Sequence, residues 1–160
     1  MNEFVASYLV YPGAAGWEYP AWRGRFYPDE LPDDWMLAFY NTQFRALWLP
    51  QPVWMAATDD EIGRWVEDTQ CGFRFVLETA AGGEDAGRTC AAKLAGRGIV
   101  ATPEWSAAHV VWLDAGFDAR ALAARIGEQA AQGQALFLIS REGDLAVLER
   151  ARELTAIMGY

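Results

Sequence analysis

Short apolar segments alternate with amphipathic segments along this chain. Six segments of four to eight residues are rich in Val, Leu, Ile or aromatic side chains, which is typical of buried strands. They are Phe4–Tyr11, Arg45–Leu49, Phe73–Glu78, Gly98–Ala101, His109–Asp114 and Ala135–Ser140. Helical patterns lie between most of them, and this alternation predicts an α/β fold with a mostly parallel sheet and crossover helices.

Four segments between or after these strands have one apolar face at helical spacing. In the first, Thr58 and Glu61 form a capping-box pattern ahead of Ile62, Trp65 and Val66. The other three helices are predicted over about 88–97, 118–132 and 144–159. Glycine and proline predict ordered loops over 12–32 and around Pro50 and Pro52, and a flexible link over 80–87.

The composition is that of one globular domain over residues 1–160, with 52% hydrophobic and 22% charged residues. The protein is acidic, with a net charge of −9, and residues 1–80 hold 12 acidic against 5 basic side chains. Since no basic stripe is present, we do not expect nucleic acid as a partner. Cys71 and Cys90 form no CxxC motif, and we recognise no signal peptide or apolar membrane span, so we predict a cytoplasmic protein.

One segment carries a family resemblance. Residues 16–28 read GWEYPAWRGRFYP, followed by Leu31 and Pro32, and they resemble the opening signature of the YecE-like family, domain of unknown function 72. The similarity continues through further positions: Phe39, Tyr40, Phe44, Arg64, Trp65, Glu67, Thr69 and Gly72 to Phe75. In the second half, residues 98–100, Asp114 and the segment FLISREGDLAVLERARELTAIMG resemble the closing part of the same family.

The resemblance implies a TIM-barrel relative that is shorter than its family. Residues 1–80 resemble the N-terminal part of the family barrel and residues 88–160 its C-terminal part. About two strand and helix units of the eight in a TIM barrel would then be missing near residues 80–87. Six predicted strands agree with a shortened TIM-barrel-like fold. Two open sheet edges would result, so we predict either a distorted six-stranded closure or a homodimer.

The chain departs from the family at the strand ends, where TIM barrels place their chemistry. Small hydroxyl residues are replaced by Ala14 and Ala15, and charged or polar family positions are occupied here by Trp48, Pro50, Glu78, Trp112 and Asp114. Tryptophan removes acid–base capacity and fills space with apolar bulk. The resemblance therefore implies a closed pocket without the family's strand-end charges.

The aromatic signature is retained, and it is the candidate ligand-binding segment. It contributes Trp17, Tyr19, Trp22, Arg23 and Tyr27. In a binding role, Arg23 would donate to an anion or a sugar while the rings stack on it. In a structural role, which we favour, the rings plug the mouth of the barrel and Arg23 pairs with an acidic neighbour such as Glu18 or Asp29.

Glu78 and Asp114 are weak catalytic candidates because both are predicted to end strands at the same edge of the sheet. Two such carboxylates can act as a general acid and base or bind Mg²⁺, although Arg141 is an available ion-pair partner. His109 is predicted to begin a strand on the opposite side, in a packing role. We expect no metal site, and no nucleotide cofactor because no glycine-rich phosphate motif is present.

Two hypotheses of function follow. The first is a non-catalytic or relic barrel of the YecE-like type that acts through protein contacts, and we lean toward it over an enzyme. The alternative is a small-molecule binding protein or hydrolase, with an anionic or sugar-like ligand, that uses the aromatic loop and the strand-end carboxylates.

Overall fold

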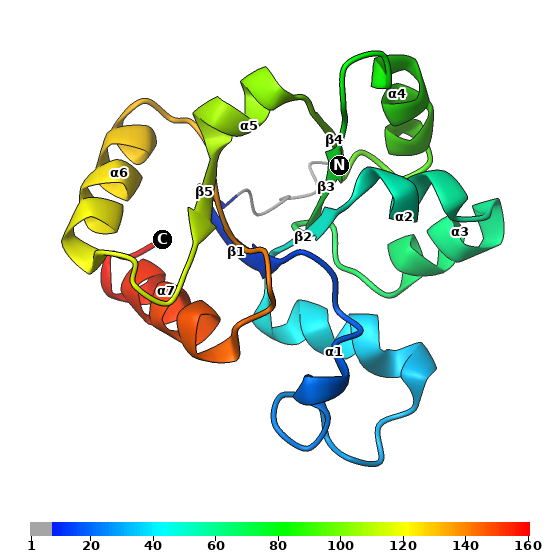
Figure 1. Ribbon diagram of the computed structural model, residues 1–160, viewed down its shortest axis with the longest axis horizontal. Helices are drawn as coiled ribbons and strands as arrows, with labels where there is room; N and C mark the ends of the chain where they lie inside the picture. Colours follow the sequence, from blue (N-terminus) through cyan, green and yellow to red (C-terminus); the bar gives the residue numbers. More distant parts are fainter. Residues whose placement is uncertain (1–7) are drawn as a thin grey trace, which may run out of the picture.

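The computed structural model describes residues 8–160, and their central feature is a six-stranded sheet that curls into an open half-barrel (Figure 1). The strands are β1 (Val10–Ala14), β2 (Ala46–Leu49), β3 (Arg74–Glu78), β4 (Gly98–Ala101), β5 (Val110–Leu113) and β6 (Leu136–Ser140). Their order is β4-β3-β2-β1-β6-β5, and every neighbouring pair is parallel. The predicted α/β class and shortened TIM-barrel-like fold are thus confirmed.

Five of the six predicted strands agree with the structure to within two residues at each end. The first prediction is wrong in its limits, because β1 begins at Val10 and continues to Ala14, while residues 4–7 lie outside the described part. Pro12 is tolerated inside this central strand because the ladder with β2 begins only at Gly13. The carbonyl of Pro12 still accepts a hydrogen bond from the Arg45 amide at 3.2 Å.

Seven α-helices surround the sheet in the described residues. They are α1 (Met36–Gln43), α2 (Gln51–Ala56), α3 (Asp59–Glu67), α4 (Glu84–Ala92), α5 (Pro103–His109), α6 (Ala119–Ala131) and α7 (Leu145–Ile157), with 3₁₀ turns at Pro20–Trp22 and Asp33–Trp35. The predicted helices α3, α6 and α7 are confirmed. Thr58 and Glu61 form the complete capping box of α3, and Asp118 and Asp144 cap α6 and α7.

The prediction over 88–97 is displaced, since α4 begins at Glu84 and ends at Ala92. Residues 80–87 are therefore not a flexible link. The amide of Ala80 donates to the side-chain oxygen of Gln51 at 2.8 Å, and the amide of Gly83 donates to the carbonyl of Ala80 at 2.9 Å. These bonds form a tight turn that runs directly into α4.

Helices α2 and α5, which the sequence pattern does not predict, each have a proline in the first turn. Pro52 stands in the first turn of α2, and Pro103 opens α5 behind Thr102, whose hydroxyl accepts from the amide of Trp105 at 3.2 Å. In these first-turn positions a proline lacks only an amide that would be unpaired anyway. His109 consequently ends α5 and does not begin a strand.

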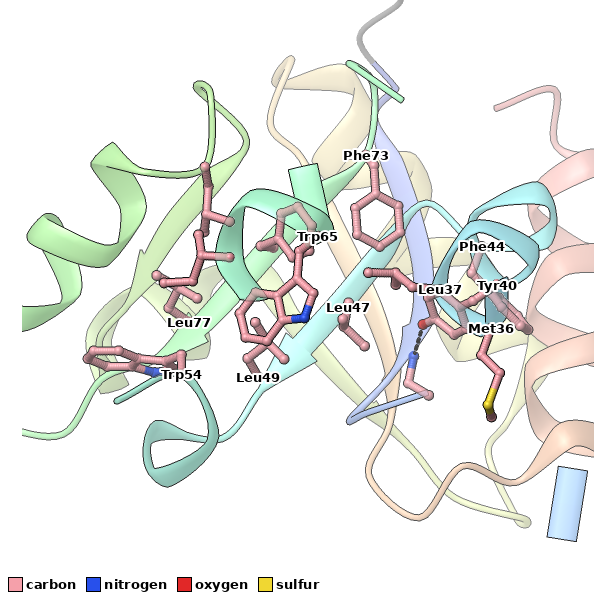
Figure 2. Close-up of a cluster of buried hydrophobic side chains, with 14 of the residues drawn as sticks. Met36, Leu37, Tyr40, Phe44, Leu47, Leu49, Trp54, Trp65, Phe73 and Leu77 are labelled. Carbon is pink, nitrogen blue, oxygen red and sulfur yellow. Dashed lines mark hydrogen bonds between the residues drawn. The ribbon is translucent and has the colours of Figure 1, made fainter. Parts of the chain in front are cut away.

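The two faces of the curled sheet pack against different partners. Side chains on the outer face alternate with those on the inner face along each strand, and the outer ones pack on the helices. Figure 2 shows this outer core, where Leu47, Leu49 and Leu77 meet Leu37, Trp54 and Trp65 from the covering helices. The inner face is filled by a separate aromatic and aliphatic cluster that contains Trp48, Tyr11 and Phe137.

The sheet is open between β4 and β5, not near residues 80–87 as the family resemblance implies. Strand β4 pairs directly with β3 across that segment, whereas β4 and β5 occupy the two ends of the strand order. Helix α5 crosses from one edge to the other (Figure 1). Its Trp105 reaches the inner face, 5.3 Å from the ring of Phe137. The six strands therefore do not close into a barrel.

Candidate functional site

The carboxyl ends of the strands, where TIM barrels hold their active sites, are filled by packed side chains. Trp48 of β2 and Trp112 of β5 meet edge to face across the inner side of the sheet, with 4.7 Å between ring centroids. The guanidinium of Arg141, just beyond β6, lies 3.8 Å from the centre of the Trp112 ring. We call these three residues the strand-end cluster. They lie at the end of the strands where TIM barrels place their active sites.

Glu78 and Asp114 have separate hydrogen-bond partners and share no hydrogen bond with each other. Glu78 ends β3 and Asp114 follows β5, so four steps of the strand order separate them. Each carboxylate is held by a backbone amide near its own strand: Glu78 by Gln51 at 3.3 Å and Asp114 by Gly116 at 2.9 Å. Arg141 stacks on Trp112 and forms no ion pair with either of them.

The aromatic loop, residues 16–28, is largely built into the core. Trp22 and Tyr27 are buried, and Trp22 donates its indole N–H to the carbonyl of Gly143 at 2.8 Å. Tyr27 donates its hydroxyl to the carbonyl of Trp17 at 2.5 Å. Burial, with a smaller effect of Glu18, raises the pKa of Tyr27 above its ordinary range. These polar groups are occupied by the protein itself.

Arg23 and Tyr19 of the same loop also contact the protein. Arg23 forms an ion pair with Asp33 and donates to the carbonyl of Leu31 at 2.8 Å. The predicted partners were Glu18 or Asp29, and Asp29 is reached only through its carbonyl, at 3.5 Å. Tyr19 donates to the carbonyl of Ala15, and its ring covers Gly143.

A groove opens beside the aromatic loop, between α1, α2 and α3, with a volume of about 570 Å³. Its apolar lining is Trp17, Leu37, Val53, Ala56, Ala57 and Trp65. Its charged lining is Glu18, Asp33, Asp34, Glu61, Asp68 and Arg64. We call it the acidic groove. Among the predicted site residues only Trp17 lines it, because the groove combines positions from segments that are far apart in the sequence.

A second cavity, of about 750 Å³, lies at the opposite end of the strands, between α1 and α7. Three of its four charged side chains have internal partners: Arg152 pairs with Glu149 at 3.0 Å, and Arg45 donates to the carbonyl of Val10 at 3.0 Å. In TIM-barrel folds this end serves stability. His109 lies at the amino end of β5, with its ring stacked on Trp105 and its Nδ1 2.9 Å from the carbonyl of Ala135.

The possible metal ligands and the two cysteines are further candidates for chemistry in the described residues. Within residues 8–160 no group of three or more His, Cys, Asp or Glu side chains could hold a metal ion. Cys71 is exposed and Cys90 is buried, and both are free thiols. In the same residues no helix is long and apolar enough to cross a membrane.

Comparisons with known proteins agree with the sequence resemblance. Residues 11–82, slightly less than half of the chain, match the family described as "Protein of unknown function DUF72". The crystal structure of a DUF72 family protein from Thermotoga maritima is similar at 15% identity and a TM-score of 0.44, over 84% of this chain and 56% of that one. The chain thus spans little more than half of that protein. No curated protein matches. Residues 11–82, which carry β1 to β3 and the aromatic loop, are thus similar to the DUF72 family, in agreement with the resemblance seen in the sequence.

Proposed function

We propose that this protein is a non-catalytic half-barrel that acts through contacts with other proteins. The observation that carries the proposal is the strand-end cluster. Trp48 and Trp112 are in contact at the carboxyl ends of the strands, and Arg141 covers Trp112. Apolar rings at these positions supply no acid, base or nucleophile.

The hydrogen bonds of Glu78 and Asp114 support the same proposal. The two residues belong to β3 and β5, and each carboxylate accepts a hydrogen bond from a backbone amide near its own strand. Carboxylates that act together in glycoside hydrolysis face a substrate between them. Here both carboxylates have partners within the protein.

A thermal-shift screen tests the absence of a small-molecule function. The protein and a Glu78→Gln/Asp114→Asn double variant would be heated with sugars, sugar phosphates and organic acids. We expect no compound to raise the melting temperature of the protein in a way that the double variant loses, because a ligand bound only to the native state must stabilise it. A compound that behaves in this way would contradict the proposal.

Self-association through β4 and β5 is one contact that the open sheet favours. Unpaired strand edges are templates for pairing with another chain, and in a full barrel such edges do not exist. The homodimer predicted from the sequence therefore remains our proposal for these edges. Sedimentation equilibrium at high micromolar concentration tests it, and a monomer there would remove the homodimer from the proposal.

The aromatic loop gives the second candidate, a small-molecule binding protein, because its Trp17 lines the acidic groove. Trp22, Arg23 and Tyr27 have their polar groups in internal bonds, so the binding site would not be the one predicted from the sequence. A thermal shift that persists in the Glu78→Gln/Asp114→Asn variant and disappears in Asp34→Asn would favour this second candidate.

A further inference from the structure

The acidic groove has an apolar floor that is partly exposed. Trp17 and Trp65 meet edge to face at 5.9 Å between ring centroids, and Leu37 is buried beside them. Val53, which also lines the groove, is 43% exposed. Aromatic side chains are enriched at protein interfaces. Its volume of about 570 Å³ is sufficient for large side chains from a partner.

Trp35 is exposed next to a groove residue in the chain. It directly follows Asp34, which lines the groove, and its side chain is the most exposed aromatic ring of the described residues, at 64%. Tryptophan is among the residues that most often carry the binding energy of an interface.

The charges around the groove are mostly negative and only partly compensated. Asp33 is paired with Arg23, and Glu61 is held by the backbone amide of Thr58 at 3.2 Å in the capping box. Glu18, Asp34 and Asp68 form no ion pair in the described part of the chain. Arg64 is the single basic residue of the lining, so the groove keeps a net negative charge.

The surroundings of Asp68 disfavour its charged form. It caps the C-terminus of α3, where the helix dipole already presents negative partial charge, and it follows Glu67. Burial, then repulsion by Glu67 and more weakly by Asp34, raises the pKa of Asp68. A cation delivered to the groove would offset the repulsion by these carboxylates, and within residues 8–160 Arg64 is the basic residue that lines the groove.

We infer that the acidic groove docks a basic, amphipathic segment of a partner protein, with its apolar side chains on Trp17, Val53 and Trp65 and its Lys or Arg side chains on Glu18, Asp34 and Asp68. This inference rests on the proposed function, since it names a surface and a partner class for a protein that acts through contacts. Charge complementarity excludes a second copy as the occupant. The chain has a net charge of −9, and residues 1–80 hold 12 acidic against 5 basic side chains.

Isothermal titration calorimetry tests the docking with a defined probe. The probe is the peptide LKKLLKLLKKLLKL, which presents leucine on one helical face and lysine on the other, and the control is LEELLELLEELLEL. We expect the lysine peptide to bind with a dissociation constant in the micromolar range and more weakly as salt is added, and the glutamate peptide not to bind. Equal binding of the two peptides, or none by the lysine peptide, would overturn the inference.

Matched variants show whether binding occurs in the groove. The Asp34→Asn/Asp68→Asn variant removes two groove carboxylates, and Glu128→Gln/Glu142→Gln removes two exposed carboxylates outside it. We expect the first variant to bind the lysine peptide about tenfold more weakly and the second less than about twofold. Equal losses would show general attraction to an acidic protein and would refute the assignment.

A third variant tests the apolar part of the surface. Val53→Lys introduces a positive charge at an exposed position, so the variant should fold normally. We expect it to weaken binding of the lysine peptide by about tenfold or more, as for Asp34→Asn/Asp68→Asn. Unchanged binding by Val53→Lys would also refute docking in the groove. Failure of the peptide leaves the proposed function standing if the thermal-shift screen finds no ligand. A ligand that needs Glu78 or Asp114 removes the proposed function whatever the peptide does.

Discussion

The hydroxyl of Tyr40 joins the first two strands of the sheet, and its removal gives the sharpest test of the fold. Tyr40 lies on α1 with no exposed surface. Its oxygen accepts a hydrogen bond from the amide of Ala14 in β1 and donates one to the carbonyl of Ala46 in β2, both at 2.7 Å. Figure 2 shows the first of these bonds as a dashed line within the apolar cluster.

Tyr40→Phe keeps the ring and removes only the bridging oxygen. The amide of Ala14 and the carbonyl of Ala46 then lose this partner in a buried region, and a buried polar group without a partner costs about 1–3 kcal/mol. Partial relaxation of the strands lowers the sum, so we expect a loss of about 2–4 kcal/mol in the free energy of unfolding. In a chain of this size a loss of 3 kcal/mol corresponds to a melting temperature about 6–12 °C lower.

Urea unfolding followed by circular dichroism measures this loss, with Tyr19→Phe as the matched control. The hydroxyl of Tyr19 also donates to a backbone carbonyl, that of Ala15, but Tyr19 is only partly buried and water can replace the bond. We expect Tyr19→Phe to cost less than about 1 kcal/mol. A Tyr40→Phe protein as stable as the Tyr19→Phe protein would refute the bridging role of Tyr40.

Three further predictions concern single positions. Gly143→Ala should destabilise more than Gly133→Ala in urea, because both have positive φ, at 65° and 66°, but only the new methyl at Gly143 lies against a tyrosine ring, 2.6 Å from its nearest atom. Asp68→Asn should raise the free energy of unfolding at pH 7 and not at pH 3. The raised pKa of Asp68 means that its protonated form favours the folded state at low pH and that this contribution is lost as pH rises through the folded-state pKa, whereas asparagine stays neutral at both pH values. An equal gain in stability at pH 3 and pH 7 would contradict this. Native thiol titration should label Cys71 quickly and Cys90 only after unfolding, because burial raises the pKa of the Cys90 thiol, and two fast thiols would disprove it.

Local signals in the sequence were sufficient for much of the fold. The capping box of Thr58 and Glu61 fixed the start of α3, and Asp118 and Asp144 fixed the starts of α6 and α7. Each of these signals is a bond between residues close in sequence, so the pattern alone identifies it. The short apolar runs located the strands for the same reason, since buried parallel strands are apolar on both faces.

Prolines and tertiary packing explain what the sequence did not reveal. Pro52 favours a loop by its residue type, and the pattern around Pro103 predicts no helix, yet each of these prolines stands in the first turn of a short helix. Helix α1 has no clear apolar face, because the aromatic loop and the sheet cover it from different sides, so its periodicity is weak. Such helices depend on their surroundings more than on their own pattern.

The sequence indicates the strand-end cluster but not the acidic groove. The substitution of family charges by Trp48 and Trp112 indicated filled strand ends, and the structure shows these two rings in contact. The acidic groove could not be seen, because it joins Trp17, Asp34, Val53 and Asp68 from four separate segments. Only the path of the chain through space brings them together.

The crossing of α5 over the open side of the sheet has a consequence for how this chain can be lengthened. No pair of strands closes the sheet between β4 and β5 in the described residues, and the segment that contains α5 connects these two strands along the chain. Strand and helix units inserted between Ala101 and Val110 would therefore extend both free edges toward each other without separating any existing pair. The sheet could therefore be extended toward a closed barrel by a single insertion at α5, with the six existing strands unchanged.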